Sequence, residues 1–126
     1  MPQALPVVLP AGTIPLSVTI NVTDAVTVRG AGRASSTIQR GTSTAFNGTG
    51  IAGATLTLED LALVGSINAG GTQALAATRV DFSGASGTFV NALNGGIAIS
   101  DCTLDGNGVN SLNGNIAIAT STLTGD

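Results

Sequence analysis

The stretch LTLEDLALVGS, residues 56–66, decides the fold of this 126-residue chain. Apolar residues stand at its first, third, sixth and eighth positions, and a glycine stands at its tenth. Each apolar pair alternates with a period of two, which is typical of a β-strand with one face buried. Between the pairs, Glu59 and Asp60 shift the phase while apolar residues continue on both sides. We therefore expect the chain to bend there around a single interior.

The same pattern recurs downstream in LAATRVDFSGA (75–85), IAISDCTLDGN (97–107) and IAIATSTLTGD (116–126), with starts separated by 19, 22 and 19 residues. The segments between the units are rich in glycine and asparagine, which tolerate left-handed backbone at corners. They also contain apolar residues that we expect in a third wall: Ile67, Phe89 with Leu93, and Val109 with Leu112. Units of about 20 residues without helical periodicity predict a parallel β-solenoid with three β faces per coil.

Upstream, AVTVRGAGRASSTIQRG (25–41) at first suggests a nucleotide-binding loop, because Gly30 and Gly32 follow a short β-type run. A dinucleotide site also needs an amphipathic helix after its glycines, and the Ser-Ser-Thr-Ile run at 35–38 is a poor helix start. We expect instead that residues 30–36 bulge out at a corner. Val26 and Val28 then take the first two inward positions, and Ile38 takes the sixth.

The composition of the chain excludes several classes of function. Only 9% of the residues are charged, the net charge is -3, and only 2% are aromatic. Four scattered arginines without any lysine do not form the basic patch that nucleic-acid binding requires. The single cysteine, Cys102, excludes an internal disulfide and a zinc site of several cysteines, and we expect it to be a buried, inert side chain. Neither a signal peptide nor a membrane span is visible, and we expect no metal and no cofactor.

The segment VVLPAGTIPLSVTINVTDAVTVRGAGRASSTIQ (7–39) resembles the opening coils of pectate-lyase-like right-handed parallel β-helices, and the later units resemble the generic coil of that superfamily. The resemblance covers nearly the whole chain. It implies an all-β, single-stranded right-handed parallel β-helix of about six coils. We expect a single domain over residues 1–126, with first coils at 7–41 and regular coils at 51–126. The superfamily includes lyases, hydrolases and non-catalytic spikes, so it does not fix an activity.

One corner position of the repeat carries charge: Asp60, Arg79, Asp101 and Thr120 follow one another on successive units. Stacking at about 4.8 Å would let Arg79 bridge the two carboxylates. The catalytic interpretation makes Asp60 and Asp101 an acid and a base on a polysaccharide, with Arg79 on a substrate carboxylate. The structural interpretation is a solvated salt-bridge ladder. We favour the ladder, because a bridging arginine keeps both carboxylates ionised, whereas catalysis needs one with a raised pKa.

We therefore predict a non-catalytic structural or interaction module of a phage tail or spike, or of a bacterial extracellular surface protein. It would be extracellular or virion-associated and would contact other proteins. The outward ladder Thr57, Ala76, Ala98 and Ala117 is small and flat, which suits self-association as a trimer, and end-to-end stacking into a fibre is a further possibility. The alternative is a polysaccharide lyase or glycoside hydrolase, or an inactive fragment of one, acting on an acidic polysaccharide. The near absence of aromatic side chains argues against that alternative.

Overall fold

The computed structural model describes residues 7–22, 25–48, 55–69, 74–83, 90–92, 96–105, 109–111 and 116–124. Every regular element in these ranges is a β-strand, and the strands form one 13-stranded sheet whose pairings are all parallel. The strands are β1 (Val7–Val8), β2 (Gly12–Pro15), β3 (Ile20–Val22), β4 (Val26–Arg29), β5 (Ser36–Gly48), β6 (Thr55–Ala69), β7 (Ala74–Ser83), β8 (Val90–Ala92), β9 (Ile97–Ser100), β10 (Thr103–Asp105), β11 (Val109–Ser111), β12 (Ile116–Ala119) and β13 (Thr122–Thr124).

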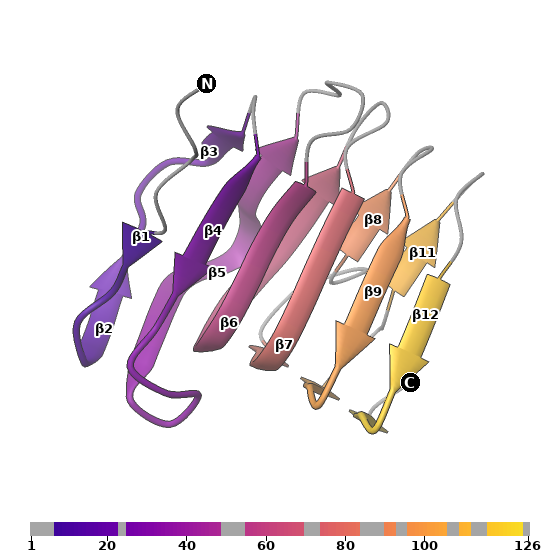
Figure 1. The fold of residues 1–126 in the computed structure, drawn as a ribbon. Helices are drawn as coiled ribbons and strands as arrows, with labels where there is room; N and C mark the ends of the chain where they lie inside the picture. Colours follow the sequence, from indigo (N-terminus) through magenta and orange to yellow (C-terminus); the bar gives the residue numbers. More distant parts are fainter. Residues whose placement is uncertain are drawn as a thin grey trace, which may run out of the picture.

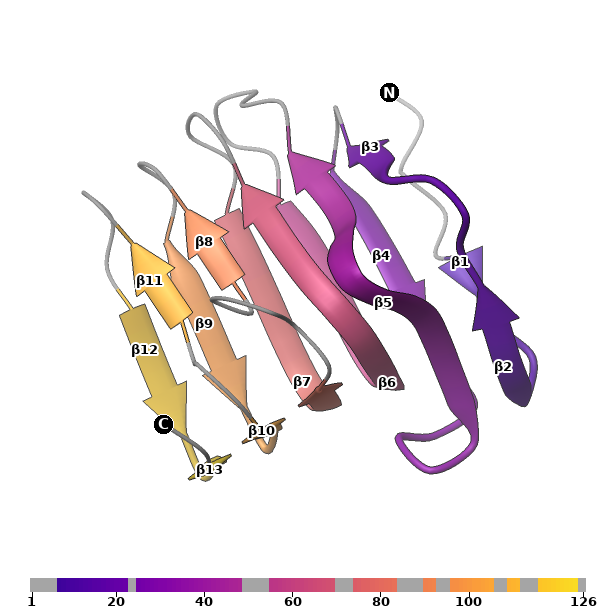
Figure 2. The same cartoon turned by 180° about the vertical axis from the view of Figure 1, so that it is seen from behind.

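The sheet folds into three walls around one interior, which confirms the predicted parallel β-solenoid (Figure 1). The first wall is the ladder β1, β4, β6, β7, β9 and β12, seen in front in Figure 1. The second wall stacks β2, β5, β6, β7, β10 and β13. The third wall stacks β3, β5, β6, β8 and β11, which Figure 2 shows from behind. The long strand β6 bends to take part in all three.

The expected number of about six coils is corrected to about three turns. Three segments, residues 7–22, 26–48 and 55–69, run through all three walls without a break in the described chain. After residue 69, the described strands continue the same three ladders. The described ranges there are separated by gaps that fall between one wall and the next. In the final segment, described strands occupy only the first and second walls.

Aliphatic columns fill the interior, as the alternation predicts. The first wall contributes Leu56 and Leu58 and their ladder partners, and the second wall contributes Leu61 and Leu63 with theirs. Their side chains are at most 5% exposed in the central coils: Val28, Leu56, Leu58, Leu61, Leu63, Leu75, Ala77, Val80, Phe82, Ile97, Ile99, Cys102 and Leu104. Each coil buries its side chains against the coils above and below, so the stack is stabilised mainly between neighbours.

The bulge predicted at residues 30–36 is shorter in the structure: residues 31–35 leave the stack at the corner between the first and second walls. Ser36 begins β5, so a strand and not a helix follows the bulge. The register corrects one expectation. Ile38 pairs with Leu63 and so takes the eighth inward position, while the sixth belongs to Ser36, which is fully buried. The Ser36 hydroxyl accepts a hydrogen bond from the Ala31 N–H at 2.8 Å and donates one to the Pro10 carbonyl at 2.7 Å. These two bonds satisfy a polar side chain in an apolar column.

The third wall contains two of the residues expected there, Ile67 and Val109, and also Val90, which was not expected. Ile67 is 1% exposed and lines the interior. Its partner on the next coil is Val90, which in turn pairs with Val109. Phe89, Leu93 and Leu112, which the sequence offered as wall residues, lie outside the described residues. The return segments contain several apolar residues each, so spacing alone does not select the one that takes the register of Ile67.

A charged corner as candidate functional site

The corner between the first and second walls has an unusual backbone that recurs on successive coils. Asp60, Arg79, Asp101 and Thr120 adopt φ angles of 56°, 53°, 56° and 48°, in the left-handed region. For residues other than glycine this conformation costs roughly 1–2 kcal/mol each. Isolated strain of this kind often marks an active site. Here it repeats on four successive coils, including the uncharged Thr120, so it belongs to the way these coils turn the corner.

The predicted pair of Asp60 and Arg79 forms. The guanidinium donates two hydrogen bonds to the carboxylate, the longer from Nη2 to Oδ2 at 3.2 Å. Hydrogen bonding from Arg79 holds the pKa of Asp60 below its ordinary value, against a smaller opposing effect of burial. The same hydrogen bonds raise the pKa of Arg79. Asp60 is therefore ionised at neutral pH, and it lacks the raised pKa that a general acid needs.

The predicted bridge to the second carboxylate does not form. Among the described residues, no ion pair reaches Asp101, which is exposed at the corner. Arg79 therefore pairs with the preceding coil alone. The expected Asp-Arg-Asp ladder reduces to one pair and one carboxylate in water.

Two further ion pairs lie on the same edge of the solenoid, and neither was predicted. The Arg29 Nη2 lies 3.2 Å from Glu59 Oε1, between directly paired residues of β4 and β6. Arg33, from the corner insertion, reaches Asp81 with Nη2 to Oδ1 at 2.8 Å. The insertion thus extends along the corner and contacts β7, which is two coils further on, beyond the neighbouring coil that contains β6. A contact between residues 48 apart, through an insertion, leaves no periodic signal in the sequence.

Metal binding finds little support at this corner. Within the described ranges, His, Cys, Asp and Glu side chains do not gather in groups of three or more that suit a metal ion. Asp81 is already paired with Arg33, and calcium prefers six to eight oxygen ligands.

The left-handed column supports a matched pair of substitutions at Arg79. Both Arg79→Asn and Arg79→Met remove the ion pair with Asp60, but asparagine tolerates the left-handed backbone much better. We expect the asparagine variant to be more stable by about 1 kcal/mol. Urea unfolding followed by circular dichroism measures the difference. Equal stabilities would contradict a backbone requirement at this corner.

An asparagine ladder on the third wall was missed by the sequence analysis. The side-chain amide of Asn47 donates to Asn21 Oδ1 at 3.2 Å, and that of Asn68 donates to Asn47 Oδ1 at 3.3 Å. The backbone register continues the column through Asn91 and Asn110. A recurring apolar-Asn pair (IN, FN, IN, VN, VN) was the signal that could have revealed it.

Cys102 lies in the second-wall column, 2% exposed, as predicted. Its Sγ lies 3.2 Å from the Ser100 carbonyl oxygen, and burial raises the pKa of the thiol. A thiol with a raised pKa is mostly protonated at neutral pH and is a poor nucleophile.

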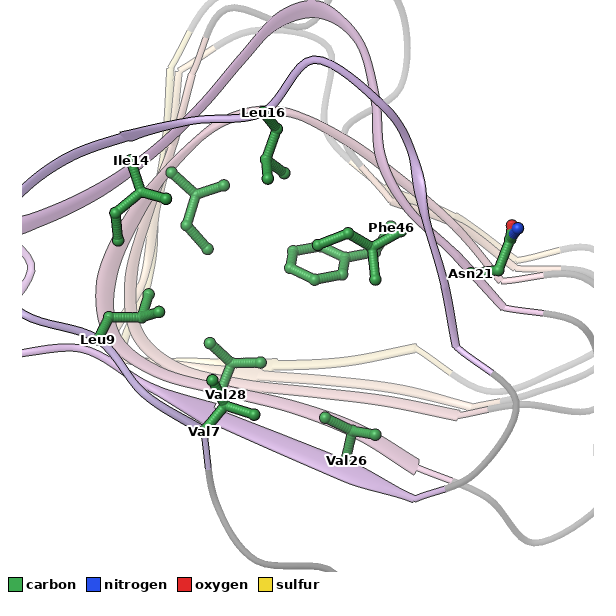
Figure 3. Close-up of a pocket in the computed structure, with 10 residues that line it drawn as sticks. Val7, Leu9, Ile14, Leu16, Asn21, Val26, Val28 and Phe46 are labelled. Carbon is green, nitrogen blue, oxygen red and sulfur yellow. The ribbon is translucent and has the colours of Figure 1, made fainter.

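Two apolar hollows lie away from the charged side chains. One, of about 320 Å³, opens at the N-terminal end of the interior and is lined by residues such as Leu9, Ile14 and Val28 (Figure 3). The other, of about 310 Å³, runs along the outside of the first wall over Ala76, Ala98 and Ala117. Asp60, Arg79 and Asp101 line neither hollow.

In the part of the chain that the structure describes, no helix has the length and apolar character needed to cross a membrane. Comparison of the chain with protein-family models, with curated proteins and with solved structures found no match. The parallel β-solenoid is thus established by the structure, whereas membership of the pectate-lyase-like superfamily stays a prediction from the resemblance.

Proposed function

We propose that this chain is a non-catalytic β-helix module that makes protein contacts in a phage tail or spike, or in a bacterial extracellular surface protein. Its place would be extracellular or on a virion. The resemblance to pectate-lyase-like β-helices supports this assignment, since that superfamily supplies rigid modules of both kinds.

One observation carries the proposal. The hollows at the N-terminal end and along the first wall are lined almost entirely by aliphatic side chains, and the charged corner lies outside both. A sugar presents hydroxyl groups that need polar partners, whereas packed protein surfaces have apolar centres. The hollows therefore suit another protein surface better than a polysaccharide. At the charged corner, Arg79 holds Asp60 ionised, which disfavours acid catalysis.

The alternative is a polysaccharide lyase or glycoside hydrolase that uses Asp60, Arg79 and Asp101. It is favoured by the exposure of Asp101, whose carboxylate has no arginine partner among the described residues. In that mechanism Asp101 would be the base and Arg79 would hold a substrate carboxylate. Asp60, as the acid, would first have to be released from Arg79.

An activity screen separates the two proposals. The wild-type protein is incubated with acidic polysaccharides, and cleavage is followed through reducing ends and, for lyase products, ultraviolet absorbance. We expect no cleavage above a protein-free control. Cleavage that Asp101→Asn abolishes, while the matched variant Asp105→Asn keeps it, would overturn the non-catalytic proposal and establish the enzyme.

A further inference from the structure

The two ends of the solenoid expose the same kind of side chain that its middle buries. One inward column of the first wall shows this coil by coil. The column runs Val7, Val28, Leu58, Ala77, Ile99 and Ile118. Its four inner members are at most 5% exposed, whereas Val7 and Ile118 at the two ends are 49% and 38% exposed. The end residues face inward like the others, and the described chain provides no further coil to cover them.

The N-terminal end is an open mouth into the aliphatic interior. Figure 3 looks into it, with Val7, Leu9, Ile14 and Leu16 directed toward the centre of the coil. The mouth has a volume of about 320 Å³. In the middle of the stack, the space above each coil is filled by inward side chains of the coil before it. The mouth therefore has the shape that one further coil of this same pattern fills.

The C-terminal end presents such a coil. Ile116 and Ile118, 42% and 38% exposed, repeat the inward pattern of β9 one coil later. Within the described strands, β12 pairs only with β9 and β1 only with β4, so each has one edge without a strand. Because every pairing is parallel, the open edge of β12 has the donors and acceptors that the open edge of β1 complements. On the second wall, Pro15 in β2 withdraws one N–H, which leaves the first wall as the main site of pairing.

Charge favours the same orientation. The described end segments, residues 7–22 and 116–124, contain no charged residue, so neither is protected in the way that charges normally block sheet edges. One coil further in, the described charges at the N-terminal end are Arg29, Arg33 and Arg40, and those at the C-terminal end are Asp101 and Asp105. Arg29 and Arg33 are paired with Glu59 and Asp81, so the attraction between opposite ends is weak, and it is strongest at low salt.

We propose that a second copy of this chain occupies the N-terminal mouth: the C-terminal coil of one copy stacks head-to-tail on the N-terminal coil of the next, with Ile118 over Val7. This inference rests on the proposed function and names the partner of the module. The contact joins different surfaces and advances along the solenoid axis, so it builds linear oligomers instead of a closed dimer.

Sedimentation velocity tests the contact with charged variants at each end. The average mass of the wild type rises above the 12.2 kDa of one chain as concentration increases, and rises further at low salt. Val7→Arg and Ile118→Arg each block one end and stay monomeric. Their equimolar mixture forms a species of twice the chain mass and nothing larger, because one open end of each kind remains. Ala98→Arg, a matched charge on the outer first wall, assembles like the wild type.

Three results would overturn the inference: a monomeric wild type, a mixture that stays monomeric, or assembly lost in Ala98→Arg but kept in Ile118→Arg. The last result would identify lateral packing along the alanine hollow. Circular dichroism verifies that each variant is folded.

A second pair of variants keeps the test independent of charge. Neighbouring parallel strands lie about 4.8 Å apart, within the Cα separation that a disulfide spans. A mixture of Val7→Cys and Ile118→Cys therefore gives a disulfide-linked dimer under mild oxidation, and neither variant gives one alone. Dimers from one variant alone, or none from the mixture, would contradict head-to-tail stacking. A monomeric but inactive protein would leave the non-catalytic module standing, whereas polysaccharide cleavage would overturn that function whatever the association state.

Discussion

Replacement of Leu58 by alanine is expected to lower the free energy of unfolding by about 4 kcal/mol, near the upper end for a buried leucine. Leu58 is fully buried in the central coils, between Val28 and Ala77 in the inward column. Ala77 is too short to reach into the space that the leucine leaves, so the cavity stays open. Such a loss is a large part of the roughly 5–15 kcal/mol that stabilises a typical domain.

The matched control for this substitution is Thr57→Ala, one residue earlier on β6 and on the outer side of the wall. Its side chain points away from the interior, and we expect a change of at most about 0.5 kcal/mol. Urea unfolding of both variants, followed by far-ultraviolet circular dichroism, gives the comparison. Similar losses for the two variants would mean that the inward column is not the source of stability.

The inward columns were predictable because one physical requirement fixes them. A side chain that points into a dry interior is normally apolar on every coil. The pattern of Leu56, Leu58, Leu61 and Leu63 therefore recurs in three more units, with Ser121 in the last unit as a polar exception. Cys102 fits the same column as a small apolar group. The prediction of the inward positions failed in the second coil, where one of them is polar. Ser36 occupies an inward position because the corner insertion supplies its hydrogen bonds, and a polar residue there hides the register.

The charged corner was only half predictable. The phase slip between the two apolar pairs located the corner, but nothing in Asp60, Arg79 and Thr120 announced a left-handed backbone, which glycine or asparagine would normally supply. The pairing of Arg79 with one neighbour instead of two depends on side-chain direction. The spacing along the sequence predicts that these charged residues lie on one edge of the solenoid, but it does not predict which of them form ion pairs.

Together these features favour an architectural role for the corner. Its strained backbone recurs on successive coils, whereas a catalytic constraint would fall on one or two of them. The three ion pairs on this edge connect β4 with β6, β6 with β7, and the corner insertion with β7. They therefore tie successive coils along the axis, and they are partly exposed, so each contributes little stability alone. Their position lets them fix the register between neighbouring coils. The aliphatic columns alone specify this register only loosely.

Gly30→Ala is expected to destabilise the protein by about 3 kcal/mol, at the upper end for an added methyl group that does not fit. A β-carbon at Gly30 would lie 2.3 Å from the Asp60 carbonyl oxygen and 2.9 Å from the β-carbons of Leu61 and Ser36. The nearest of these atoms belongs to the backbone, and the Gly30 N–H also donates to the Glu59 carbonyl at 2.9 Å. The methyl group therefore fits only if the second and third coils, which contain Gly30 and Asp60, move apart at the corner.

Gly41→Ala is the control that separates crowding from backbone preference. Gly41 has a φ of 82° and open space where its β-carbon would lie, so alanine there meets only the cost of a left-handed residue, about 1 kcal/mol. Unfolding of both variants in urea should place Gly30→Ala well below Gly41→Ala in stability. The opposite order would show that the corner insertion yields easily, and that the close approach of Gly30 to Asp60 does not hold the insertion on the stack.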